Sequence, residues 1–411
     1  MAVQKKIAFL SKPFHKGGVT RWMVDAAVYM SNTGYEVYFL AVEPKYEFVI
    51  GKAKETAMKL LADEQHKVHI VKKMVGHSFE FGTPGYITEV YRDLLKQLEP
   101  GTPVIIADYD LIWKAAASLA NTYPMIGVLH GDYGYYYDIS KKYAENLSVV
   151  AGVSGRIRDR FVQLNPGFDP NHAVAIPCGT VLPEFRPLNE RNDNVIKLIF
   201  IGRFEAPEKR VKDLVSIAAV LHARGIAFHM DIVGNLPESE KKFSQLFKDQ
   251  SLDQFISFRG WQTRKEIENL LFDCDILLLN SEYEGMPIVL MEALSCGCGF
   301  VGTRVSGVED YEFHPLAPDC IGVYTMGDFD DAVNKIQKVA AVPKSTRYRS
   351  ARKIAEAEFS IQICTDRYVA AINSLDKQPK PTVKFQFGLK DRLKSNLLSL
   401  ARHVKLRYLK R

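Results

Sequence analysis

Short runs of β-branched and aromatic residues alternate with amphipathic segments along almost all of this 411-residue chain. The segments with helical periodicity include residues 19–30, 214–223 and 264–271. Such alternation is typical of parallel sheets covered by helices on both faces. The candidate strands are residues 7–10, 36–41, 68–71, 103–107, 125–129, 148–153, 173–176, 198–202, 227–233, 255–258, 276–280, 299–302 and 322–324. These are too many for one comfortable sheet, so the sequence predicts two doubly wound Rossmann-like α/β domains.

A polar segment that contains two prolines and lacks periodicity, residues 183–194, is the predicted boundary. We therefore predict a first domain over 1–186 and a second over 194–358. Ligands of open α/β sheets bind beyond the carboxyl ends of the strands. In a protein with two such sheets, we expect these ends to face each other across a cleft that holds the site.

Composition excludes several classes of protein. No apolar run reaches the roughly 18 residues of a membrane span, and the N-terminus lacks the apolar length and cleavage site of a signal peptide. The six cysteines are scattered, without the second pair that a zinc site needs, so we expect buried, reduced thiols in a cytoplasmic protein.

Two glutamates with seven residues between them, Glu284 and Glu292, follow the apolar strand 276–280. Pro287 suits the first position of a helix, where its missing N–H costs nothing. Glu292 is the only charge between residues 288 and 294, and a buried carboxylate is costly without a partner. We expect Glu292 to be buried and to meet a polyol or a hydrogen-bond donor. An exposed glutamate on an amphipathic helix is the alternative.

Two cations follow the strand 198–202. Arg203 comes directly after it and Lys209 six residues later. Cations at the mouth of a parallel sheet suit a diphosphate, and a guanidinium grips two oxygens at once. A solvated, charged loop is the alternative.

In the first half, Gly17 and Gly18 stand between a strand and a helix, where glycine lets the backbone approach an anion; a tight turn is the alternative. His130 ends the strand 125–129, where it is a candidate to contact substrate or a structural histidine. The Gly17-Gly18 loop is not the full GxGxxG fingerprint, and the sequence contains no GxxxxGK[ST], which argues against a nicotinamide dehydrogenase and a P-loop NTPase.

Taken in order, these elements resemble glycosyltransferase family 4, the retaining nucleotide-sugar transferases of GT-B fold. In the second half the resemblance is carried by Ile201–Arg203, Glu208-Lys209, Asp231–Gly234, Asp275, Asn280-Ser281, the Glu284–Glu292 bracket and Ala293–Gly297. In the first half it is carried by the Gly-Gly loop, His130-Gly131, Val153-Ser154 and Ile176–Gly179. The chain departs from the pattern at Arg210, where glycine is common, which places a bulky cation near the expected phosphates.

The resemblance implies roles in the second domain. Arg203 and Lys209 would neutralise the donor diphosphate as the sugar leaves. Glu284 would accept hydrogen bonds from the transferred sugar, and Glu292 from the nucleotide ribose. The donor-binding backbone would be that of Gly285, Met286 and Pro287, aided by the dipole of the following helix.

In the first domain, Gly17 and Gly18 would admit the phosphates and His130 would touch the sugar. Asp132 and Tyr133 are candidates for the acceptor side. The helix at 359–375 resembles the last helix of the family, which crosses back to the first domain.

The chemistry implied by the resemblance retains the anomeric configuration and needs neither a metal nor a cofactor. Asp-x-Asp pairs, the usual mark of a metal-bound diphosphate, occur at 108/110, 273/275 and 328/330, and we interpret them as coincidental. The expected enzyme is a hexosyl- or N-acetylhexosaminyltransferase that uses a UDP- or GDP-sugar and a hydroxyl acceptor in bacterial cell-surface glycan or lipid-linked saccharide synthesis. A non-catalytic partner subunit that binds glycan or protein is the alternative from another class; an epimerase or a glycan phosphorylase is the alternative of the same fold.

The C-terminal tail, residues 376–411, holds eleven Lys or Arg and two Asp, which leaves 43 basic and 46 acidic residues in the rest of the chain. Apolar residues form a helical stripe at Leu389, Leu393, Leu397, Leu400, Val404 and Tyr408. A basic amphipathic helix at 389–411 predicts peripheral contact with an anionic membrane, here the inner face; docking on the protein's own body is the alternative. Nucleic acid is not an expected partner, because the body is not basic.

Overall fold

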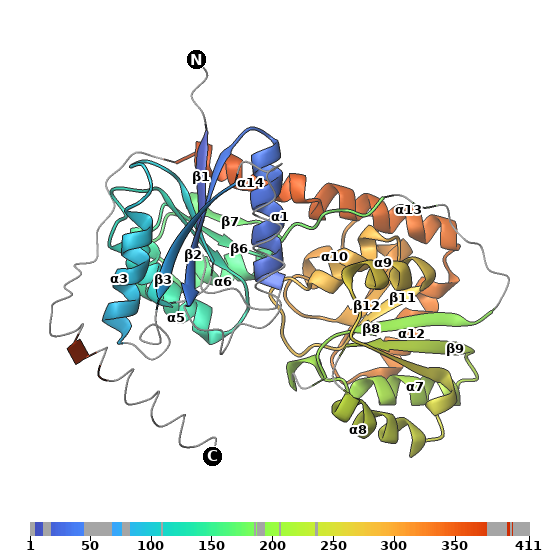
Figure 1. The fold of residues 1–411 in the computed structure, drawn as a ribbon. Helices are drawn as coiled ribbons and strands as arrows, with labels where there is room; N and C mark the ends of the chain where they lie inside the picture. The colour runs from blue at the N-terminus through green and yellow to red at the C-terminus, as the bar shows by residue number, and fades with distance from the viewer. Residues whose placement is uncertain are drawn as a thin grey trace. The chain divides into compact units, whose positions relative to one another are not determined.

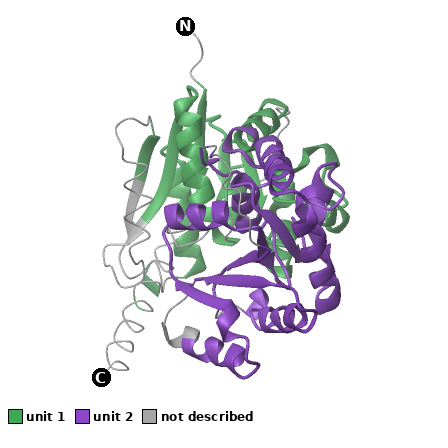
Figure 2. Ribbon diagram, turned by 90° about the vertical axis from the view of Figure 1, so that its right-hand side faces the viewer, with its two compact units in different colours: residues 1–176, 364–411 green, residues 177–363 purple. Residues whose placement is uncertain are grey.

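The computed structural model describes residues 5–10, 18–44, 68–75, 83–107, 110–184, 186, 194–204, 207–234 and 237–375, together with Leu393, Lys394 and Leu397. The chain divides into two compact units (Figure 2). Unit 1 comprises residues 1–176 and 364–411, and unit 2 comprises residues 177–363.

Unit 1 is built on a seven-stranded sheet of order β3-β2-β1-β4-β5-β6-β7, in which every paired strand is parallel (Figure 1). The strands are β1 (Lys6–Leu10), β2 (Glu36–Pro44), β3 (Val68–Val75), β4 (Val104–Ile106), β5 (Met125–Leu129), β6 (Val149–Gly152) and β7 (Ala173–Ala175). The strand order reverses between β1 and β4, and such a point favours ligand binding at the carboxyl ends of the strands.

The helices of unit 1 connect these strands. Among the described residues they are α1 (Gly18–Asn32), α3 (Pro84–Leu95), α4 (Asp110–Ala117), α5 (Gly134–Tyr143) and α6 (Gly155–Leu164), with short 3₁₀ turns η1 (Ala144–Asn146) and η2 (Pro170–His172). The helix α14 (Ile361–Asn373) belongs to unit 1 from Cys364 onward. It is held there by the buried indole of Trp22 on α1, which donates to the Cys364 sulfur at 3.3 Å and packs on Tyr368.

Unit 2 contains a six-stranded parallel sheet of order β10-β9-β8-β11-β12-β13. Its strands are β8 (Ile196–Ile201), β9 (Phe228–Val233), β10 (Ile256–Gly260), β11 (Ile276–Leu279), β12 (Gly299–Thr303) and β13 (Ile321–Tyr324). The order reverses between β8 and β11, so the carboxyl ends of these two neighbours are the expected ligand-binding edge.

The helices of unit 2 are α7 (Asp213–Ala223), α8 (Pro237–Lys248), α9 (Arg264–Asp273), α10 (Ile288–Ser295), α11 (Ala317–Cys320), α12 (Phe329–Ala341) and α13 (Lys344–Ile354). Shorter turns are η3 (Pro207–Lys209), η4 (Asp253–Phe255), η5 (Glu309–Tyr311) and the π-helical η6 (Ala355–Phe359). The sequence-based prediction of two parallel, doubly wound sheets is confirmed.

A buried ion pair fixes the amino-terminal edge of β8 and β11. The Asp275 carboxylate accepts from the backbone N–H of Lys197 at 2.9 Å and from the Arg347 guanidinium at 2.7 Å. Arg347 is 3% exposed and also donates to the carbonyl oxygens of Val339 and Val342. The pair therefore joins two neighbouring strands to the segment between α12 and α13.

All six cysteines are buried free thiols, as the sequence predicts. The predicted membrane helix at 389–411 lies outside the described residues, apart from Leu393, Lys394 and Leu397; these two leucines are 55% and 68% exposed. In the part of the chain that the structure describes, no helix combines the length and the apolar character needed to cross a bilayer.

Replacing Arg347 by methionine should lower the free energy of unfolding by about 3–5 kcal/mol, because the Asp275 charge is left buried without its partner. Urea denaturation followed by circular dichroism measures this loss. Arg349→Met, on the exposed face of the same helix, is the matched control and should change stability by less than about 0.5 kcal/mol. Equal effects of the two substitutions would contradict the structural role of the pair.

Candidate functional site

Lys209 and Glu284 meet at the carboxyl edge of the unit 2 sheet. Lys209 ends η3, which follows β8, and Glu284 lies in the loop between β11 and α10. The Lys209 ammonium nitrogen lies 2.5 Å from Oε1 of Glu284, and the Ser281 hydroxyl donates to the same oxygen at 2.6 Å. The side chains of Lys209 and Glu284 are 19% and 14% exposed. Sequence reasoning selected both residues but did not predict that they pair.

The loop that carries Glu284 is tied to its neighbours by hydrogen bonds. The Thr303 hydroxyl, at the end of β12, donates to the Ser281 carbonyl oxygen at 2.6 Å. The Tyr324 hydroxyl, at the end of β13, donates to Oδ1 of Asn280 at 2.9 Å. The Glu282 N–H donates to the Glu208 carbonyl oxygen at 2.7 Å, which joins the loop to η3. Three separate segments thus hold the Glu284 carboxylate in place.

Gly307 supports the same loop by having no side chain. Its φ is +77°, and a Cβ there would stand 2.6 Å from the Gly285 carbonyl oxygen and 2.8 Å from the Met286 Cα. Gly285, Met286 and Pro287 are themselves buried. Pro287, predicted at the first position of the helix, is instead the N-cap of α10, which begins one residue later at Ile288. Sequence reasoning missed Gly307 and Thr303; the signal available was a Gly-Thr strand end followed closely by a glycine.

Arg203 and Arg210 differ in how firmly neighbouring carboxylates hold their side chains. The Arg203 side chain is 73% exposed and approaches Glu208 only at 3.5 Å, so it can reorient toward a ligand. Arg210 adopts a φ of +44°, which explains why glycine suits this position. Its guanidinium is bound to Asp213 at 2.7 and 3.2 Å, an acidic residue in the first turn of α7. The positive charge expected near the phosphates is therefore offset locally.

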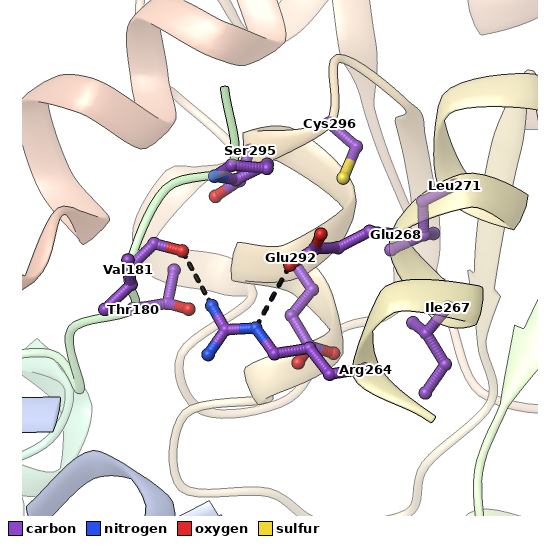
Figure 3. A pocket seen from close by; sticks show the side chains of 10 residues that line it. Thr180, Val181, Arg264, Ile267, Glu268, Leu271, Glu292, Ser295 and Cys296 are labelled. Carbon is purple, nitrogen blue, oxygen red and sulfur yellow. Dashed lines mark hydrogen bonds and ion pairs between the residues drawn. The ribbon is translucent and has the colours of Figure 1, made fainter. Parts of the chain in front are cut away.

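Glu292 lines a pocket between α9, α10 and the segment that follows β7 (Figure 3). The pocket residues are Thr180, Val181, Pro183, Arg264, Ile267, Glu268, Leu271, Glu292, Ser295 and Cys296. Arg264 is held across the opening by Glu268 at 3.1 Å and by the Val181 carbonyl oxygen at 2.8 Å. Burial, with the nearby carboxylates Glu268 and Glu292, raises the pKa of Cys296 to about 12, so its thiol stays protonated.

The expectation that Glu292 is buried was wrong. The residue is half-buried, because the core contacts of α10 are made by Leu290, Met291 and Leu294 while Glu292 lies at the pocket. The pocket presents the Glu268 and Glu292 carboxylates and the Arg264 guanidinium, and Glu268 already accepts a hydrogen bond from Arg264.

In unit 1, His130 follows β5 and makes an edge-to-face contact with Trp22 at 5.1 Å between ring centres. Gly18 is the first residue of α1, whereas Gly17 lies outside the described residues. Tyr133 is the N-cap residue of α5 and is 43% exposed. The roles predicted for His130, Gly17 and Gly18 stay predictions.

The Asp132 carboxylate is bound by neighbouring side chains of unit 1. Its side chain is 7% exposed and accepts from Arg156 and Arg160, both at 3.0 Å, and from the Tyr137 hydroxyl at 2.7 Å. Burial and the Asp132 charge raise the pKa of Tyr137, which keeps this phenol a hydrogen-bond donor. Asp132 therefore stabilises its own loop, and its contact with an acceptor stays a prediction.

Three aspartates of the Asp-x-Asp pairs have structural partners. Asp275 binds Arg347, Asp328 accepts from the Asp331 N–H at the start of α12, and Asp330 pairs with Arg224. Within the described ranges, no group of three or more His, Cys, Asp or Glu side chains is arranged to hold a metal ion.

Comparison with known proteins finds similarity over the segment that carries this site. Residues 183–349, which include Arg203, Lys209, Glu284 and Glu292, match the family model of glycosyl transferases group 1. The chain is 27% identical over 212 residues to a lipopolysaccharide 1,6-galactosyltransferase of Salmonella typhimurium, covering 48% of this chain and 55% of that protein. It is 34% identical over 117 residues to the N-acetyl-alpha-D-glucosaminyl L-malate synthase of Bacillus anthracis, covering 28% and 29%. The aligned parts thus span about a third to a half of these relatives.

Solved structures share the whole fold. HepE of Anabaena, solved in complex with UDP and glucose, superimposes with a TM-score of 0.68 at 18% identity, covering 90% of this chain and all of that one. The apo form of a lipopolysaccharide outer core galactosyltransferase gives 0.66 at 19% identity, covering 90% and 99%. The predicted GT-B fold is confirmed.

Replacing Gly307 by alanine should displace the Gly285–Met286 backbone and lower stability by about 1–3 kcal/mol more than the same change at Gly327. Gly327 is the matched control, since its φ is +84° but nothing lies within 4 Å of an added Cβ. Urea denaturation compares the two variants. Equal losses of unfolding free energy in the Gly307 and Gly327 variants would contradict the role assigned to Gly307.

Proposed function

We propose that this protein is a retaining, metal-independent glycosyltransferase of family 4, which transfers a hexosyl or N-acetylhexosaminyl group from a nucleotide sugar to a hydroxyl of a glycan or lipid-linked saccharide. The observation that carries the proposal is the Lys209–Glu284 pair at the carboxyl edge of β8 and β11. It combines a cation for a diphosphate with a carboxylate for sugar hydroxyls. The match of residues 183–349 to glycosyl transferases group 1 supports it.

The donor is proposed to be a UDP-sugar, with a GDP-sugar as the second choice. HepE of Anabaena, which shares the fold, has been solved with UDP and with UDP-glucose. On this proposal the nucleoside occupies the pocket between α9 and α10, and Glu292 accepts from the ribose hydroxyls. The diphosphate then lies toward the start of α10, where the N–H groups of the first turn carry partial positive charge.

Donor binding would rearrange the ion pair. The Lys209 ammonium is bound to Glu284. A diphosphate brings more negative charge than one carboxylate, so it would attract the Lys209 ammonium and free Glu284 to accept from the sugar hydroxyls. Ser281 keeps its hydrogen bond to Glu284 and preserves the carboxylate's position. The exposed Arg203 side chain would close on the same phosphates.

The chemical step would use this charge arrangement. As the bond to the sugar breaks, positive charge grows on the sugar ring and negative charge on the leaving diphosphate. Lys209, Arg203 and the N-terminus of α10 would stabilise the diphosphate. Retention is proposed to arise by attack from the face that the diphosphate leaves, with a phosphate oxygen taking the acceptor proton.

The products are proposed to belong to a bacterial cell-surface glycan. A relative acts in lipopolysaccharide synthesis by its name, and others carry the name of colanic acid biosynthesis. The basic segment 389–411 is proposed to hold the enzyme at the inner face of the cytoplasmic membrane, near a lipid-linked acceptor.

Isothermal titration with UDP, GDP, ADP and their sugar conjugates tests the donor. We expect one nucleotide class to bind selectively, and Glu292→Ala to weaken it by about 10- to 100-fold, the loss expected for hydrogen bonds to a charged group. Glu282→Ala, an exposed carboxylate on the neighbouring loop, is the matched control and should bind as the wild type does. Absence of binding by any of these nucleotides to the folded protein would overturn the proposal and favour a non-catalytic subunit.

A further inference from the structure

Four tyrosines surround the start of α5, at the end of β5. Tyr133 and Tyr135 are 43% and 41% exposed, whereas Tyr136 is 3% exposed. Large aromatic side chains are usually covered, so two exposed rings side by side require an explanation.

The two exposed rings are held nearly parallel. The Tyr133 and Tyr135 planes differ by 19°, with centres 6.4 Å apart. Tyr136 meets both edge to face, at 5.1 Å from Tyr133 and 5.5 Å from Tyr135. A buried ring thus supports two exposed ones, and we call Tyr133 and Tyr135 the tyrosine platform.

Contacts with neighbouring groups of the protein hold the tyrosine platform in place. A Cβ on Gly131 would stand 2.3 Å from Cε1 of Tyr133, so only glycine lets that ring lie against the loop. The Tyr135 hydroxyl accepts from the Asp110 N–H at 3.3 Å, at the start of α4. Asp132, bound by Arg156 and Arg160, anchors the loop beneath. A preformed surface loses little conformational entropy when it binds.

The platform lies at the ligand-binding edge of unit 1. Its loop continues β5 at the carboxyl end, and α4, to which Tyr135 is bound, follows the adjacent strand β4. The strand order reverses between β4 and β1, which is where open α/β sheets bind their ligands. The position therefore agrees with a binding surface better than with an incidental exposed patch.

We propose that the tyrosine platform binds a pyranose ring of the saccharide acceptor, an assignment that rests on the proposed function. A pyranose has an apolar C–H face and a rim of hydroxyls. Tyrosine offers a flat apolar face with a polar end, and it is rigid enough to lose little entropy. Arg156 and Arg160, 43% and 48% exposed, are bound to Asp132 of the same loop and offer further N–H donors. A lipid chain would instead require a continuous apolar groove without these charges.

Saturation-transfer NMR on the full chain tests the platform, with maltotriose, cellotriose and chitotriose as probes. At least one trisaccharide should receive saturation at its ring C–H protons. Tyr133→Ala and Tyr135→Ala should each weaken its binding by about fivefold, as expected for loss of one aromatic contact. Tyr133→Phe should retain binding within about twofold, because the ring face is kept. Phe313→Ala, an 85% exposed aromatic of unit 2, is the control and should bind as the wild type does.

Titration with UDP on the same samples separates this inference from the proposed function. Trisaccharide binding that is indifferent to both tyrosine-to-alanine changes overturns the platform, as does absence of trisaccharide binding in a protein that binds UDP. Tyr133-dependent binding of a polyprenyl phosphate in micelles, without trisaccharide binding, also overturns it and assigns the rings to lipid. Tyr133-dependent trisaccharide binding without UDP binding supports the platform and removes the proposed function.

Discussion

The pairing of β8 with β11 is the constraint on which the site of unit 2 depends. At the amino-terminal edge, the Asp275 carboxylate bonds to Lys197 and Arg347 and so links the two strands to the region of α13. At the carboxyl edge, the loops that follow the same strands bring Lys209 and Glu284 together. One ion pair thus lies at each end of the β8–β11 strand pair. The carboxylates of the two pairs are similarly exposed, at 12% for Asp275 and 14% for Glu284, whereas the cations differ, at 4% for Arg347 and 19% for Lys209.

The site also depends on small residues and hydroxyls that carry no charge. Thr303 and Ser281 form a hydrogen-bonded chain from β12 to Glu284, and Gly307 lets the loop after Val305 pack against Gly285. These contacts limit the positions of the carboxylate without adding charge to the site. If a diphosphate takes Lys209 as proposed, these contacts would keep the Glu284 carboxylate in position.

The sequence predicted the fold well because alternating strands and amphipathic helices are local patterns, and two doubly wound sheets follow from their number. It also selected Arg203, Lys209, Glu284 and Glu292, since charges directly after buried strands or within apolar helices are conspicuous. It could not predict that Lys209 pairs with Glu284, because that contact joins residues 75 apart and depends on which strands are neighbours. The degree of burial of Glu292 was predicted wrongly for a similar reason. Its surroundings include a pocket that is lined by Thr180 and Val181, which lie far away in the sequence. The run of tyrosines after His130 was visible, but the orientation of the rings depends on Gly131, Asp110 and Asp132.

The central claim is that the donor diphosphate replaces Glu284 as the partner of Lys209. Isothermal titration of UDP and of the matching UDP-sugar into Lys209→Met and Glu284→Gln tests it most directly, with Lys212→Met as the control for an exposed lysine. Lys209→Met should weaken the binding of both ligands. Glu284→Gln should bind UDP at least as tightly as the wild type, since a competitor for Lys209 has been removed, but should lose the additional affinity for the sugar. If Glu284→Gln weakens UDP as much as Lys209→Met does, the exchange of partners is contradicted.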